Sequence, residues 1–267
     1  MSRFLKISVY AAAALTFGLL IFIIGYILYM GLPALDADMF SAVYTAENAS
    51  VLPAAANTAV ITVCALLAAG ILGIFGAVYI SEYTRRGSRA VRIIRLGAET
   101  LAAVPSIVYG LFGMLFFVIY LGWGYSLLAG AATLALMVLP LILRTSEEAL
   151  RGVPAAYRDA AMGLGAGRLR TVFAVTLPSA VPGILSGIIL AAGRIVGETA
   201  ALIYTAGSVA QMPVSLMSSG RTLAVHMYAL SGEGLYTDKA YATAVILLIF
   251  VLFINLSAAY AAERVKK

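Results

Sequence analysis

Charged side chains are scarce in this chain of 267 residues, because Asp, Glu, Lys and Arg together make up only 11% of it. Soluble globular domains carry about 25% charged residues, so this composition excludes that class. Hydrophobic residues make up 63% of the chain and gather in long uncharged runs. Such runs exceed the ~20 apolar residues that a helix needs to cross a bilayer. The composition therefore predicts an all-α integral membrane protein.

Cysteine, histidine and lysine are also rare. The single cysteine, Cys64, excludes an internal disulfide and is expected to pack as a small apolar residue. The single histidine, His226, has no cysteine or acidic cluster beside it, so no metal site is expected. None of the four lysines stands in the G-x-x-x-x-G-K-[ST] pattern of a nucleotide-binding loop. We therefore expect no cofactor on this chain and no enzymatic activity, so any ATP-Mg would have to bind to a partner.

Uncharged runs cover residues 7–35, 51–81 and 100–143, and two more apolar stretches cover 182–207 and 240–262. The run of 100–143 is too long for one crossing, because a straight helix of that length would reach ~66 Å and the hydrocarbon core is only ~30 Å thick. We interpret it as a hairpin of two spans with its turn at 121–125, where Gly122 and Gly124 break the helix and Trp123 and Tyr125 suit the interface. Six spans are therefore expected.

The basic residues indicate an orientation for these spans. Fifteen of the 18 Lys and Arg residues fall on one side of the six-span arrangement: Arg3, Lys6, Arg85, Arg86, Arg89, Arg92, Arg95, Arg144, Arg151, Arg158, Arg168, Arg170, Arg264, Lys266 and Lys267. Only Arg221 and Lys239 fall on the other side. Because such an excess marks the cytoplasm, both termini are expected inside a prokaryotic cytoplasmic membrane. A nucleic-acid patch at 85–95 is disfavoured, since the segment is short and next to the membrane.

We expect three parts in the chain. Residues 1–55 hold the first span and an external loop, residues 56–262 hold a core of five spans, and residues 263–267 form a cytoplasmic tail. The core is interrupted by a polar loop, residues 147–182. In this loop Pro154 suits the first turn of a helix, three glycines from Gly163 to Gly167 end that helix, and a second helix is expected from Arg168 to just before Pro178.

The polar loop resembles the EAA loop of the ABC importer permeases. The residues that carry the resemblance are Asp159-Ala160-Ala161, then Gly165, Val175 and Leu177-Pro178, with Asp in place of the usual Glu and Val in place of Ile. The resemblance implies that the first helix docks on a cytoplasmic ATPase subunit, with contacts from Tyr157, Arg158, Asp159, Ala160, Ala161 and Gly165. The alternative is an interfacial helix without a partner.

Two charged residues stand inside the fifth apolar stretch. Arg194 and Glu198 are four residues apart, which would place them on one face of a helix. Intramembrane charges usually face a bundle interior or an aqueous path, and a guanidinium suits an oxyanion. The alternative is an ion pair that only fixes helix packing. Glycines at 183, 187, 193 and 197 have the spacing of close helix–helix contacts.

The third span has a predicted bend at Pro105. The carbonyls freed by that bend need donors, and Ser106 and Tyr109 either satisfy them or line a polar path. Arg95 and Glu99 are expected to form an i,i+4 salt bridge near the start of this span. Arg221 and His226 are expected on the external side, on a solvated face or, as the alternative, at a site near a docking protein.

Three further stretches sharpen the resemblance: VPSIVYGLFG at 104–113, GRIVGETA at 193–200, and AYATA at 240–244. They resemble the permeases of phosphate-specific ABC importers, and SGRTLAVH at 219–226 resembles their PstA-type subunit. The family implies the type I importer permease fold, a second and different permease, two ATPase subunits, an external phosphate-binding protein, a lipid environment and no nucleic acid. Alternatives are a permease for sulfate or molybdate, a secondary transporter, or a hydrolase built on Ser219 and His226.

Overall fold

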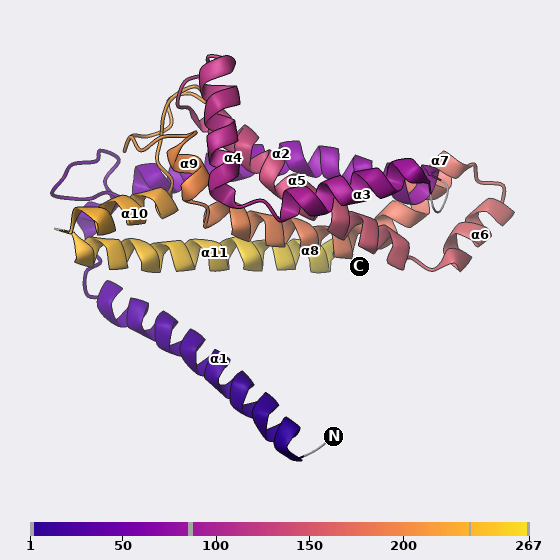
Figure 1. The fold of residues 1–267 in the computed structure, drawn as a ribbon, viewed down its shortest axis with the longest axis horizontal. Coiled ribbons are helices and arrows are strands. Elements are labelled where there is room, and N and C mark those ends of the chain that lie inside the picture. Colours follow the sequence, from indigo (N-terminus) through magenta and orange to yellow (C-terminus); the bar gives the residue numbers. More distant parts are fainter. Residues whose placement is uncertain (1–2, 85–87, 235, 266–267) are drawn as a thin grey trace.

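The structure is a computed structural model that describes residues 3–84, 88–234 and 236–265, and all regular elements within these ranges are helical (Figure 1). The first half of the chain forms α1 (Arg3–Gly31), η1 (Ala37–Phe40), α2 (Leu52–Val78), η2 (Tyr79–Tyr83), α3 (Arg89–Ala102), α4 (Ser106–Gly113), η3 (Met114–Tyr120) and α5 (Leu127–Gly152). The second half forms α6 (Ala155–Gly163), α7 (Arg168–Thr171), η4 (Val172–Thr176), α8 (Leu177–Val196), α9 (Ala200–Ile203), α10 (Leu223–Glu233) and α11 (Thr237–Val265). Arg85, Arg86, Lys266 and Lys267, which the topology prediction uses, lie outside the described residues.

A bundle of four long helices forms the body of the protein. Helix α2 packs on α5, α5 on α8, and α8 on α11, while α1 diverges from the bundle (Figure 1). The core between α2, α5 and α8 is built from fully buried aliphatic side chains such as Ile61, Leu134, Ile142 and Ile195. Short helices α6 and α7 lie at one end of the bundle, and α9 and α10 lie toward the other (Figure 1).

Five helices of the described chain are long and apolar enough to cross a membrane: Leu5–Gly31, Leu52–Tyr83, Leu127–Gly152, Arg168–Val196 and Thr237–Ser257. Helices Arg89–Ala102 and Ser106–Tyr120 meet the same criteria only when taken together, and they are bent by 99° at the break between them. The described chain therefore has five spans, or the predicted six if this bent pair counts as one span, and the predicted all-α class is confirmed.

The third span differs from a simple limb of a hairpin. It begins at Arg89 and is broken where the sequence places Pro105, so the predicted bend is present, but it is close to a right angle. The sequence predicts that the third span begins at residue 100, because residues 89–99 include several charged side chains. These residues instead form the first turns of α3. The hydroxyl of Tyr109 donates to the carbonyl oxygen of Leu101 at 2.8 Å, which satisfies a group freed by the break. The predicted turn after this span is confirmed by positive φ angles at Gly122 (68°) and Gly124 (63°).

The fifth span also differs from the prediction at both ends. The second helix of the polar loop does not stop before Pro178, because α7, the π-helical η4 and α8 follow one another directly from Arg168 to Val196. Pro178 directly follows the π-helical η4, so the helix continues through the proline that was expected to end it. At its other end the helix stops at Val196, so Glu198 is not on it.

Close packing between α8 and α5 depends on two of the four spaced glycines. A Cβ at Gly183 would stand 2.6 Å from the Cβ of Ala149, and one at Gly187 would overlap Thr145. These contacts confirm the predicted close approach for this pair. Gly193 has open space instead, and Gly197 meets only the carbonyl oxygen of Gly193, so that pair is not a contact between helices.

The segment around Arg221 and His226 is not a solvated face, since both residues are buried. The guanidinium of Arg221 lies 4.4 Å from the ring centre of Tyr44, and that ring meets the imidazole of His226 edge-on at 5.9 Å. These contacts hold the segment between α1 and α2 against α10. The expectation failed because the tertiary fold covers residues whose polarity suggested exposure.

Candidate functional site

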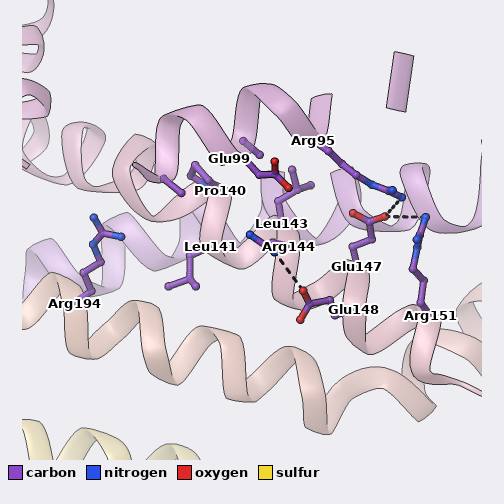
Figure 2. Close-up of a pocket in the computed structure, with 12 residues that line it drawn as sticks. Arg95, Glu99, Pro140, Leu141, Leu143, Arg144, Glu147, Glu148, Arg151 and Arg194 are labelled. Carbon is purple, nitrogen blue, oxygen red and sulfur yellow. Dashed lines mark hydrogen bonds and ion pairs between the residues drawn. The ribbon is translucent and has the colours of Figure 1, made fainter. Parts of the chain in front are cut away.

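A cavity of about 350 Å³ lies between α3, α5 and the end of α8 (Figure 2). Its walls carry four arginines and three glutamates: Arg95, Arg144, Arg151, Arg194, Glu99, Glu147 and Glu148. Apolar residues such as Pro140 and Leu141 complete the lining. Four arginines against three glutamates leave a formal charge of +1 on the lining, which favours a small anion over a cation.

Three of the four arginines are already paired. Glu147, which is buried, accepts from Arg95 at 2.5 Å and from Arg151 at 3.0 Å (Figure 2). Glu148 accepts from Arg144 at 3.4 Å. The predicted Arg95–Glu99 salt bridge is therefore wrong: Arg95 reaches across to α5 because the Glu147 carboxylate is buried there and needs a partner.

Arg194 differs from the other three arginines. It is exposed to the cavity in the last turn of α8, and within the described chain it makes no hydrogen bond or ion pair. A cation is favoured at a helix C-terminus, which helps to explain why the charge is tolerated there. Figure 2 shows its guanidinium at the opposite end of the lining from Arg151 and Arg95.

Glu198 does not neutralise Arg194. The helix ends between the two residues, and the Glu198 carboxylate accepts a hydrogen bond from the backbone N–H of Ala201 at 3.1 Å. That bond satisfies an N-terminal donor of α9, so the predicted one-helix ion pair is absent from the described structure. Ser106 is half-buried at the start of α4, and Tyr109 is buried with its hydroxyl bonded to Leu101. Neither residue lines the cavity.

A second cavity of about 910 Å³ adjoins the first and shares Arg95, Glu99 and Arg151 with it. It extends along α3 to the end of α2, where Glu82 and Arg158 line it. The linings of the two cavities together extend from Arg194 of α8 to Arg158 of α6.

In the sequence, Arg144 and Arg151 serve only as basic residues that indicate topology, and Glu147 only as the start of the polar loop. Their shared face was visible in the spacing, because Arg144, Glu147, Glu148 and Arg151 stand at i, i+3, i+4 and i+7. The partnership with Arg95 was not visible, since it depends on how α3 packs against α5.

The polar loop forms the predicted short helix. Pro154 precedes α6, and α6 ends at Gly163. Gly165 has a φ of 84°, a conformation that favours glycine, and α7 begins at the predicted Arg168. Helix α6 has no buried residue: Tyr157, Asp159 and Ala160 are exposed, and Ala161 is half-buried. This helix therefore offers a free face to a partner.

Arg158 is the exception on α6, because its guanidinium contacts this chain. It pairs with Glu82 at 2.8 Å, and it donates to the carbonyl oxygens of Leu150 at 2.7 Å and Val153 at 3.1 Å. It thus satisfies carbonyls at the C-terminal end of α5 and joins α6 to the end of α2.

The comparisons with known proteins agree with this geometry. Residues 69–267 match the family model of the binding-protein-dependent transport system inner membrane component. The chain belongs to this family. The permease is 33% identical over 85% of its length to the phosphate transport system permease protein PstA of Xylella fastidiosa, covering 80% of that protein. It is 32% identical over 92% of its length to PstA of Pasteurella multocida, covering 89% of that protein.

Solved structures confirm the fold of the permease. An inward-facing MetNI methionine ABC transporter chain superposes with a TM-score of 0.65 at 21% identity, covering 79% of this chain and 94% of that one. A chain of a bacterial ABC transporter that imports the polysaccharide alginate superposes with a TM-score of 0.62 at 17% identity, covering 100% of both. The predicted type I importer permease fold is therefore confirmed, and the family description, an inner membrane component, supports the predicted membrane location.

Proposed function

We propose that this permease forms half of the pathway by which an ATP-driven importer carries inorganic phosphate across the cytoplasmic membrane. The observation that carries the proposal is the unpaired Arg194 in an arginine-lined cavity of a chain whose relatives include PstA permeases. Phosphate bears one to two negative charges at neutral pH. The free energy of moving such an ion from water into an apolar medium without any partner is prohibitively high. An arginine lowers that cost through Coulomb attraction and forked hydrogen bonds.

The cavity suits passage rather than trapping. Conduction requires an anion to bind strongly enough to enter and weakly enough to leave. Glu147 and Glu148 already occupy three of the arginines, so only Arg194 presents a free guanidinium in the described lining. Glu198 acts on the path indirectly, by fixing the N-terminus of α9 just beyond Arg194. Ser106 and Tyr109 stay predictions for the path, and the bond to Leu101 favours a structural role for Tyr109.

The family and the exposed helix α6 support the proposed partners. A second, different permease completes the pathway, two ATPase subunits bind ATP-Mg in the cytoplasm, and an external protein delivers phosphate. The family description names dependence on a binding protein, and one solved relative is an alginate transporter in complex with its periplasmic protein. Tyr157, Asp159, Ala160, Ala161 and Gly165 form the ATPase-facing surface. The α6 end is cytoplasmic, and so are both termini.

Uptake by the whole importer tests the proposal. The permease is co-expressed with the ATPase, second permease and binding protein of the same importer in cells that lack other phosphate uptake, and radioactive phosphate uptake is measured. We expect uptake that requires ATP and that excess sulfate or molybdate does not suppress. Suppression by either anion, with uptake of that anion instead, identifies a different oxyanion importer. Uptake that continues without the ATPase subunits identifies a secondary transporter.

A further inference from the structure

Helix α6 packs beside α7 and η4, but it buries no residue against them. None of its residues is buried, and two large apolar side chains of the loop, Tyr157 and Leu164, are 54% and 91% exposed. These two residues are seven positions apart and share one face of α6 and its end. Arg158 lies on another face and reaches back into the protein, with a side chain that is only 21% exposed. This guanidinium therefore supplies the side-chain link from α6 to Glu82 and to the end of α5.

Both helices of the loop contact Glu82, which lies in η2 directly after α2. Arg158 of α6 pairs with the Glu82 carboxylate at 2.8 Å. Arg168 of α7 donates to the backbone carbonyl oxygen of Glu82, and its guanidinium lies 5.2 Å from the ring centre of Tyr83. Glu82 and Tyr83 are part of η2, a π-helical turn that ends the second span. Such turns are rare and are found frequently at functional sites.

The Glu82–Arg158 ion pair is largely shielded from solvent and is supported by further hydrogen bonds of the same guanidinium. The Glu82 side chain is only 10% exposed, so its attraction to Arg158 is weakly screened. The guanidinium also holds Leu150 and Val153 at the end of α5, so one side chain fixes α6 to α2 and α5 together. Helices α2 and α5 pack along much of their length. A displacement of α6 therefore acts on both helices at once.

We propose that Glu82 is a positioning residue that transmits movement of α6 to the transmembrane bundle, through its ion pair with Arg158. The inference rests on the proposed function, because it assumes that an ATPase moves α6. It separates two roles within the loop: the exposed face receives the ATPase, and Arg158 with Glu82 passes the movement inward. Removing the carboxylate should leave docking intact and loosen the link between ATP hydrolysis and transport.

The test uses the complete importer reconstituted in lipid vesicles with phosphate-loaded binding protein. ATP hydrolysis, phosphate uptake and the amount of bound ATPase subunit are measured in the same preparation. Glu82→Gln retains the size of the side chain but removes its charge, and we expect wild-type ATPase retention with about a 2- to 30-fold rise in ATP consumed per phosphate. Arg158→Lys, which keeps the charge but loses the fork, should shift the ratio in the same direction. The double variant should be no worse than the more impaired single variant.

Matched controls are Glu47→Gln on the exposed loop after α1 and Arg170→Lys on the exposed face of α7, which should both keep the wild-type ratio. A wild-type ratio in Glu82→Gln overturns the proposal, and so does loss of the ATPase subunit, which would make Glu82 a docking residue. If the Glu82→Gln importer does not assemble, the ATP consumed per phosphate by Arg158→Lys decides instead. If neither variant assembles, the ion pair has only a structural role and the proposal is overturned. If wild-type vesicles carry sulfate or molybdate instead, the solute proposal fails, and the ratio is measured with that anion.

Discussion

At the scale of single residues, the role of Arg194 is inferred from its lack of a carboxylate partner within the described chain. The other cavity arginines each have a carboxylate, whereas Arg194 has none within the described chain. A charge within a membrane-spanning helix is costly, and the Arg194 guanidinium is exposed to the cavity, so its presence favours a ligand that arrives and leaves. The expected ion pair with Glu198 would have removed that argument, and its absence strengthens the case for the pathway.

Arg194→Gln tests this role. Glutamine retains some hydrogen bonding but loses the charge, and hydrogen bonds to a charged group are worth ~1.5–3 kcal/mol, so uptake should fall by at least ~10-fold. The permease should still assemble with its ATPase and bind ATP, which purification and nucleotide binding can check. Arg170→Gln, which removes an exposed charge from α7, serves as the control. Normal uptake in Arg194→Gln would exclude the pathway role, and failure to assemble would assign Arg194 to structure.

His226 is a second residue whose chemistry is set by its surroundings. Its Nε2 lies 3.2 Å from the carbonyl oxygen of Ala49, and because a carbonyl only accepts, Nε2 carries the proton there. Burial, followed by the nearby Arg221 cation, lowers the pKa of His226 from 6.5 to about 4. Between these two values the unfolded chain binds the proton and the folded chain does not, so stability falls as the pH falls.

The expected loss between pH 7 and pH 4 is about 3 kcal/mol from this residue alone. Thermal unfolding of the detergent-purified permease should therefore shift to lower temperature as the pH drops through 6.5. His226→Gln removes the titrating group, so its unfolding temperature should depend less on pH in this range. Equal pH dependence in wild type and variant would show that other groups dominate.

At the scale of elements, local chemistry predicted the short features well. The turn at Gly122 and Gly124, the end of α6 at Gly163 and the start of α7 at Arg168 all follow from glycine and proline preferences. The π-helical turns η2 and η4 carry no comparable signal, because they depend on how neighbouring helices accommodate an extra residue. The sequence alone could not predict the ion pairs Arg95–Glu147 and Arg158–Glu82, since each joins residues more than 50 positions apart.

The turn after α6 gives a test at this scale. Gly165 has a φ of 84° and open space around it, so a side chain there is opposed by backbone strain rather than by a clash. Gly165→Ala should cost ~1–2 kcal/mol in this turn and reduce retention of the ATPase subunit on purification. Gly163→Ala is the control, because that position is equally open and has no positive φ. Equal retention in both variants would argue against a role for the turn in docking.

At the scale of the whole molecule, charge separates the two ends of the bundle. Arginines of α3, α6 and α7 and of the C-terminal half of α5 lie toward one end, where Figure 1 shows α6 and α7. The opposite end, near α10, holds Arg221 and Lys239, and Lys239 lies 3.9 Å from Asp36. Because basic residues are retained on the cytoplasmic side, this separation predicts that the α6 end faces the cytoplasm.

Labelling of single cysteines in intact cells tests this orientation. Cys64 is first replaced by alanine, and one cysteine is then introduced at Leu164, which is 91% exposed, or at Val43, which is 68% exposed. These positions lie at opposite ends of the bundle, so an impermeant thiol reagent should label Val43→Cys in intact cells and Leu164→Cys only after lysis. The α6 face at Leu164 is also where an ATPase should bind, so labelling after lysis should drop when the ATPase subunit is co-expressed. Strong labelling of Leu164→Cys in intact cells would reverse the topology and would place the proposed ATPase surface outside the cell, where no ATPase could drive the importer.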